Sequence, residues 1–168
     1  KDMVAEVAET CFSFLHMEMV QMALRSDSAS PSHAELQLAG RKLEAAGFQV
    51  GVRLIERYTR ERPRFADTLE IIKFICKDFW FEIYRKQIDK LQTNNRGVYM
   101  LQDNKHRLLS RCSPSVERQA NAKQICTLHA KFPSGLIRGA LHGLGVAASV
   151  GVEVDRLTSC QFTIKIQT

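Results

Sequence analysis

The first apolar stretch of the chain, from Met3 to Arg25, predicts a helix with an unusually wide hydrophobic surface. At about 100° per residue, one face carries Val4, Val7, Ala8, Cys11, Phe12, Phe14, Leu15, Met19, Met22 and Ala23, and a second patch carries Met17, Val20 and Leu24. Polar residues interrupt the stretch, so it does not reach the roughly 20 apolar residues of a bilayer span. Two readings stay open: a central helix wrapped by its own domain, or a helix with one face against another chain.

The next segment continues the helical pattern. Apolar residues recur at helical intervals at Leu36, Ala39, Leu43, Ala46, Val50, Leu54, Ile55 and Tyr58. Gly47 stands where a left-handed cap would end a helix. The segment is therefore either two helices or one helix bent at Gly47 and Gly51.

A third helix is predicted after the break at Pro63. Asp67 is a suitable N-cap, and Glu70 three residues later completes a capping-box arrangement. We expect this helix to run to about Leu91. Its apolar face rotates along its length. In its second half, the side of the helix that Glu70 and Lys73 occupy earlier carries apolar residues, namely Trp80, Phe81, Tyr84 and Ile88. Packing within the domain is favoured over a partner contact for this aromatic group.

The hydrophobic period changes to two from Gly97 onward, which predicts strands. Segments 98–102 and 107–110 flank a polar turn at 103–106, and segments 150–155 and 162–167 alternate apolar with polar residues. Segment 132–145 reads as a further helix, in which Gly135, Gly139 and Gly143 predict close packing within the domain. Polar residues without a period predict a surface insertion at 113–124, which we extend to 113–127. Helices around two antiparallel hairpins give an α+β layer fold, and the length favours a single domain over residues 1–168.

Composition indicates the redox compartment of the protein and the class of partner that its charge favours. Five cysteines among 168 residues form no Cys-x-x-Cys pair, and the start lacks the features of a signal peptide, so we expect reduced thiols in the cytosol. The net charge is +6 and the sequence pI is about 9.2. Acidic and basic residues are interleaved, so a solvated basic surface is favoured over a nucleic-acid footprint.

The chain carries no positive signal for enzyme chemistry, a bound metal or a cofactor. The five histidines have no metal-ligand spacing, and neither a Gly-x-Ser-x-Gly elbow nor a Walker loop is present. A nucleophile pair of Cys126 and His129 stays open, although a lone cysteine is usually a small buried hydrophobe. Cys76 falls on an apolar helix face, so we expect it to be an inert core thiol.

Several separated blocks together resemble one known family, the small subunits of the transport protein particle (TRAPP) complex, and within it the sixth-subunit type. The blocks cover nearly the whole chain in register: LHMEMV at 15–20, GFQVG at 47–51, LIER at 54–57, IKFICKDFW at 72–80, KQID at 86–89, LQDNK at 101–105 and GLIRGAL at 135–141. The resemblance implies a two-layer fold with helices on one side of a four-stranded antiparallel sheet.

The resemblance also implies a function and partners. It implies a non-catalytic subunit of a vesicle tether in ER-to-Golgi and Golgi traffic, which supports guanine-nucleotide exchange on a Rab-type GTPase only through the assembly. It implies a cytoplasmic protein, peripheral at cis-Golgi and endoplasmic reticulum membranes, that forms a heterodimer with a paralogous small subunit. The first two helices are expected to make that contact, with the interface residues Val7, Cys11, Phe14, Leu15, Met19, Met22, Leu36, Leu43, Phe48 and Val52.

One departure from the family pattern concerns lipid. A paralogous subunit carries an acylated cysteine before the third helix, and Arg62 aligns with it here, so no acyl pocket is assigned. Two other hypotheses remain beside the assembly subunit. One is a small apolar-ligand-binding domain of the same fold, whose lining would use some of the nine phenylalanines. The other is nucleic-acid binding by the basic surface.

Overall fold

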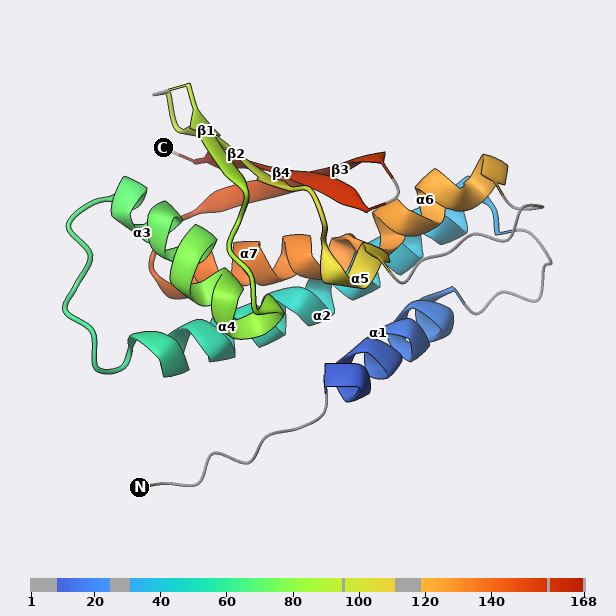
Figure 1. Ribbon diagram of the computed structural model, residues 1–168, viewed down its shortest axis with the longest axis horizontal. Coiled ribbons are helices and arrows are strands. Elements are labelled where there is room, and N and C mark those ends of the chain that lie inside the picture. The colour runs from blue at the N-terminus through green and yellow to red at the C-terminus, as the bar shows by residue number, and fades with distance from the viewer. Residues whose placement is uncertain (1–8, 25–30, 95, 111–118, 157, 168) are drawn as a thin grey trace.

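The computed structural model (Figure 1) describes residues 9–24, 31–94, 96–110, 119–156 and 158–167. Its elements follow in the order α1 (Glu9–Ala23), α2 (His33–Thr59), α3 (Thr68–Phe74), η1 (Ile75–Phe79), α4 (Trp80–Tyr84), β1 (Lys90–Thr93), β2 (Val98–Asp103), α5 (Arg107–Ser110), α6 (Gln119–His129), α7 (Lys131–Gly143), β3 (Ala148–Arg156) and β4 (Ser159–Ile166). In the part of the chain so described, no helix is both long enough and apolar enough to cross a membrane.

The four strands form one antiparallel sheet in the order β1-β2-β4-β3. The helices lie on one side of it, with α7 against the sheet and α2 beneath α7 (Figure 1). The α+β class, the four-stranded antiparallel sheet and the carboxyl-terminal hairpin are therefore confirmed. Because β3 and β4 alternate buried and less buried residues over most of their length, Val152, Val154, Phe162 and Ile164 all face the helices.

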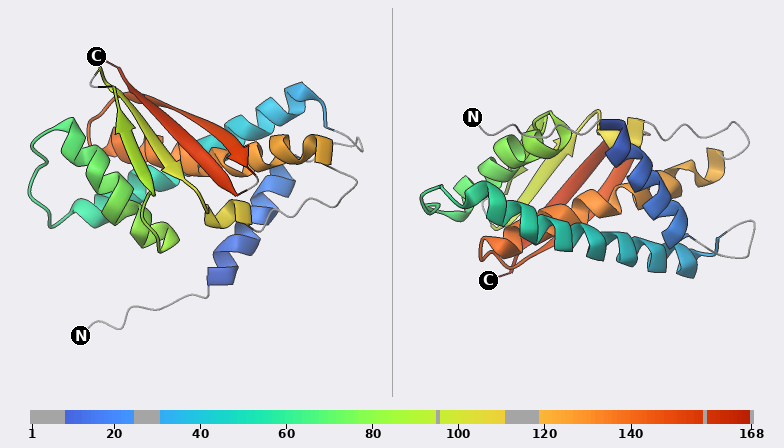
Figure 2. Two further views of the ribbon diagram at one scale, coloured as in Figure 1. Left: turned by 45° about the horizontal axis from the view of Figure 1, so that its top comes forward. Right: turned by 90° about the horizontal axis from the view of Figure 1, so that it is seen from below.

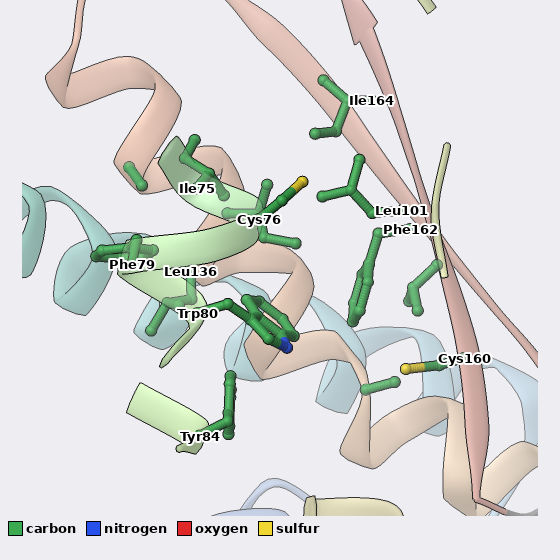
Figure 3. Packing of buried hydrophobic residues seen from close by; sticks show 14 of the residues in the cluster. Ile75, Cys76, Phe79, Trp80, Tyr84, Leu101, Leu136, Cys160, Phe162 and Ile164 are labelled. Carbon is green, nitrogen blue, oxygen red and sulfur yellow. The ribbon is translucent and has the colours of Figure 1, made fainter. Parts of the chain in front are cut away.

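The main core lies between the sheet and the helices α3, α4 and α7. Phe79, Trp80, Leu101 and Phe162 are fully buried there and come from the helical layer and the strands (Figure 3). The aromatic rings meet edge to face, as in Trp80 and Phe162, whose centroids are 5.5 Å apart. The space between the sheet and the helices is thus filled by the protein's own side chains.

Glycines bring α2 and α7 into backbone contact. A Cβ at Gly47 would overlap the carbonyl oxygen of Phe132, and one at Gly135 would overlap that of Glu44. The prediction of close intradomain packing at Gly135 and Gly139 is confirmed. The interpretation of Gly47 as a helix cap is wrong, since α2 runs unbroken from its Ser32 capping box to Thr59. Its glycines serve the approach of another helix, which the sequence of α2 alone does not reveal.

The third predicted helix begins as expected and ends earlier. The Asp67 carboxylate accepts the amide of Glu70, as an N-cap does. Five residues, Ile75–Phe79, then form a π-helical turn, and such a turn shifts the buried face around the axis, which accounts for the rotating pattern. The helix stops at Tyr84 because Arg85 is left-handed (φ 54°), so the predicted end at Leu91 is wrong. Leu91 lies in β1 instead.

The first predicted hairpin has a different partner strand. β2 pairs with β1 before it, whereas residues 107–110 form α5, so the prediction of a strand there is wrong. The reason lies in the turn between them. Asp103 and His106 are both fully buried, and Asp103 accepts hydrogen bonds from the Trp80 indole (3.1 Å) and, through a short contact, from Lys86. These bonds tie the turn to α4 and prevent a solvent-exposed hairpin turn.

The segment predicted as a polar insertion is partly helical. Residues 119–127 lie in α6, and the assignment of the segment as an insertion stays a prediction. Residues 113–118 lie outside the described residues. The predicted helix at 132–145 is observed as α7.

Candidate partner interface

The inner side of α1 attaches this helix to the rest of the fold. Val20 is buried in a small cluster with Ala39, Leu43 and Leu128 from α2 and α6. Further along α1, Phe12 and His16 pack against the ring of Phe132 at centroid distances of 6.0 and 5.6 Å. These contacts use one side of the wide apolar surface of α1.

The other side of α1 is exposed to solvent. Phe14, Leu15 and Met22 are 62%, 57% and 60% exposed. Among the described residues, seven large hydrophobic side chains are exposed, and six of them lie on α1 and α2. We define the outer face as Cys11, Phe14, Leu15, Met17 and Met22 of α1 with Leu38 and Val50 of α2.

The outer face lies on the side of the molecule opposite the sheet. Figure 2 shows α1 and α2 together on this side, with the strands behind them. Scattered apolar residues on a protein surface are common, but a group of long apolar side chains on two adjacent helices marks an interaction site. The wide apolar face of α1 therefore divides into an inner side that packs within the domain and an outer side that is exposed.

The predicted interface residues divide into four groups. Cys11, Phe14, Leu15 and Met22 are exposed on the outer face, and Val7 lies outside the described residues. Met19, Leu36, Phe48 and Val52 are half-buried. Leu43 is only 2% exposed and belongs to the chain's own core, so it has no surface to offer to a partner.

Phe48 is half-covered by groups of α7. The Arg138 guanidinium lies 4.5 Å from the centre of its ring and forms an ion pair of 3.1 Å with Glu44. The His142 ring lies 5.3 Å away. Phe48 is thus mainly a contact between α2 and α7.

Leu38 and Val50 of the outer face are not among the predicted interface residues, although they are 53% and 38% exposed. The prediction followed the Leu36 and Leu43 stripe, which faces inward. A signal for the other stripe exists, because Leu38 lies four residues after Ala34 and seven before Ala45, and both alanines are exposed. This sparse pattern is easily overlooked beside the stronger buried one.

Arg62 occupies a surface position at the end of the helical layer. Its guanidinium pairs with Asp78 at 3.2 Å and lies 4.4 Å from the centre of the Phe74 ring. A small surface hollow of about 250 Å³ adjoins it, lined in part by Tyr58, Phe79 and Glu82. The arginine therefore covers an aromatic cluster at this position.

Two buried thiols and two buried imidazoles lie in environments that suppress their charged forms. Burial raises the pKa of Cys76 to about 12 and also raises the pKa of Cys160. Burial likewise lowers the pKa of His16 to about 3 and of His129 to about 4. In the described part of the chain, no group of three or more His, Cys, Asp or Glu side chains is arranged to hold a metal ion. Cys76 and Cys160 are therefore poor sources of a thiolate, and His16 and His129 are not bases poised near neutral pH.

Comparisons with known proteins are consistent with this arrangement. The family model of the transport protein particle (TRAPP) component matches residues 12–167. The chain belongs to the TRAPP family. It is 44% identical to trafficking protein particle complex subunit 6b of Danio rerio and to subunit 6B of Homo sapiens, in each case over 95% of this chain and 97% of the relative. Subunit 6A of Bos taurus is 39% identical over 93% of this chain and 95% of the relative, so this TRAPP chain is of the sixth-subunit type.

A solved structure confirms the TRAPP fold. The crystal structure of trafficking protein particle complex subunit 3 from Naegleria fowleri, covalently bound to palmitic acid, superposes with a TM-score of 0.75 and covers 94% of each chain. Its sequence is only 14% identical to this chain. The likeness therefore concerns the fold alone.

Proposed function

We propose that this TRAPP chain is a non-catalytic assembly subunit that forms a heterodimer with a paralogous small subunit through its outer face. The observation that carries the proposal is the exposure of Phe14, Leu15 and Met22 on α1, with Leu38 exposed on the adjacent helix α2. Burial of such side chains stabilises association, with a few large residues dominating. The names of the relatives, all subunits of a trafficking particle, support the assembly role.

In this proposal the chain acts through the assembled complex. The complex tethers vesicles in ER-to-Golgi and Golgi traffic and supports guanine-nucleotide exchange on a Rab-type GTPase, which the chain itself reaches only indirectly. We place it in the cytoplasm, peripheral at cis-Golgi and endoplasmic reticulum membranes through its partners. No nucleic acid is part of this role.

The alternative of an apolar-ligand-binding domain has less support. Phe79, Trp80 and Phe162 are fully buried and fill the space between the helices and the sheet. The structural neighbour holds palmitic acid covalently, whereas here Arg62 covers the neighbouring Phe74 ring. A guanidinium must stay hydrated or paired, so its position favours a closed interior.

The test is a double substitution on the outer face, Phe14→Asp and Leu15→Asp. We expect loss of co-elution with a co-expressed paralogous small subunit, because charge buried without a partner in an apolar contact costs several kcal/mol. Phe81→Asp is the matched control, since Phe81 is 45% exposed on α4, away from the outer face. A folded double variant that still co-elutes with the paralogue would show that the interface lies elsewhere.

A further inference from the structure

A second surface lies where α6 runs beside the first turns of α2 (Figure 1). Here the molecule has an open groove of about 530 Å³, whose lining includes Leu36, Gly40, Lys123, Thr127, Leu128 and Lys131. None of these residues belongs to the outer face. The groove is therefore a separate feature of the fold.

The base of the groove is apolar and closely packed. Leu128 is 4% exposed and Leu36 is half-buried. Gly40 has no side chain, and the methylene stem of Lys131 passes 3.5 Å from where its Cβ would stand. The stem thus contributes apolar surface while the ammonium group remains available at the rim.

The rim of the groove is basic. Lys123 and Lys131 both line it, and no described residue of the lining carries a carboxylate. Two carboxylates of α2 that flank this stretch in the sequence are engaged elsewhere: Glu35 accepts the Ser32 amide in the helix cap, and Glu44 pairs with Arg138. The positive charge at the rim is consequently not neutralised within the described part of the chain.

We propose that this groove binds an acidic amphipathic helix of a partner protein. Leucine-type side chains of that helix would pack on Leu36 and on the methylene stem of Lys131, and its carboxylates would pair with Lys123 and Lys131. Lys123 lies on α6 and Lys131 is the first residue of α7, so the two ammonium groups come to the groove from two helices and can meet carboxylates on successive turns of a docked helix. An open groove suits a helix better than an acyl chain, which needs an enclosed site to leave water.

The proposal goes beyond heterodimer formation. Since the groove and the outer face share no residue, one copy of the subunit can hold the paralogue and the acidic helix together. Binding at the groove therefore gives the subunit a means to attach a further component of an assembly.

The experiment measures binding of a fluorescein-labelled peptide with leucines at helical spacing and two glutamates on successive turns. We expect saturable binding to the full chain, and about tenfold weaker binding to a Lys123→Glu/Lys131→Glu variant, because two rim charges are reversed. A peptide with lysines in place of the glutamates should bind the variant and not the natural chain. Lys131 is the first residue of α7, where a glutamate is favoured by the helix dipole, so the variant should fold. Its melting temperature checks this.

Two controls decide between outcomes. A Lys73→Glu/Lys77→Glu variant reverses the same number of exposed charges on α3 and η1, and it should bind the glutamate peptide as the natural chain does. The Phe14→Asp/Leu15→Asp variant should also keep this binding, which separates the groove from the outer face. Absence of saturable binding, an equal loss in the Lys73/Lys77 variant, or displacement of the peptide by oleate would each overturn the proposal.

Discussion

At the scale of single residues, glycines set the distance between α2 and α7, and two glycines of α2 make a matched test. A methyl group at Gly47 would overlap the Phe132 carbonyl, so Gly47→Ala forces the helices apart and should destabilise the protein by about 2 kcal/mol or more. Gly40→Ala meets only side-chain atoms at ordinary contact distance, and it should stabilise the protein by about 0.5–1 kcal/mol through helix propensity. Urea denaturation of the two variants measures both changes, and equal effects would disprove this account of α2.

The cysteines differ in access, which gives a second prediction at this scale. Cys76 is 8% exposed with a raised pKa, whereas Cys11 is exposed on the outer face. A thiol reagent at neutral pH should therefore modify Cys11 quickly and Cys76 slowly, because only the accessible thiolate reacts. Mass spectrometry of peptides after timed labelling assigns each site. Rapid labelling of Cys76 in the native protein would reopen the enzyme hypothesis.

At the scale of elements, the sequence predicts a helix or strand correctly where the segment itself carries a hydrophobic period or a capping residue. The alternation in β3 and β4 and the Asp67 cap of α3 are of this kind. The predictions failed where a distant contact decides the structure. Gly47 looks like a helix cap in the sequence of α2, because its contact with α7 involves residues far along the chain. The turn at 103–106 looks like a hairpin turn, because the hydrogen bond from Trp80 to Asp103 joins residues 23 positions apart.

The same limit applies to the candidate interface. The width of the apolar face on α1 indicates more apolar surface than one internal contact uses, but the period alone does not say which side faces inward. That division depends on where Ala39, Leu43 and Leu128 lie in space. Leu43 is therefore buried and Leu38 is exposed, whereas of the two only Leu43 is predicted at the interface.

The attachment of α1 should depend on pH. His16 is 1% exposed, its ring lies 5.2 Å from that of His129, and burial, with the nearby His129 and His106, lowers its pKa from 6.5 to about 3. Because the pKa of His16 is lower in the folded protein than in the unfolded chain, the side chain binds a proton more readily once α1 detaches. The free energy that holds α1 in place is therefore fully present above pH 6.5 and is lost as the pH falls toward 3. Between pH 7 and 5, hydrogen exchange corrected for intrinsic rates should speed up more in α1 than in α7. His16→Phe should reduce that difference, and equal changes in the two helices would contradict the prediction.

At the scale of the whole molecule, the layering of the fold separates an interior filled by its own aromatic side chains from a surface that carries the exposed apolar outer face and the basic groove. The sheet and α7 enclose the core, and α1 and α2 cover the far side (Figure 2). Membrane attachment in this arrangement would come from the assembled complex and not from a lipid held by the chain.

The lipid prediction follows from Arg62. An arginine cannot form the thioester that a cysteine forms, and this guanidinium is already paired with Asp78 and stacked on Phe74. The purified chain should therefore show its unmodified mass by intact mass spectrometry, and it should float poorly with neutral liposomes. The palmitoylated subunit 3 of Naegleria fowleri serves as the positive control, because it has the same fold with a covalently bound fatty acid. A mass increment equal to a fatty acyl chain on the purified protein would show that its interior opens to lipid and that Arg62 does not close it.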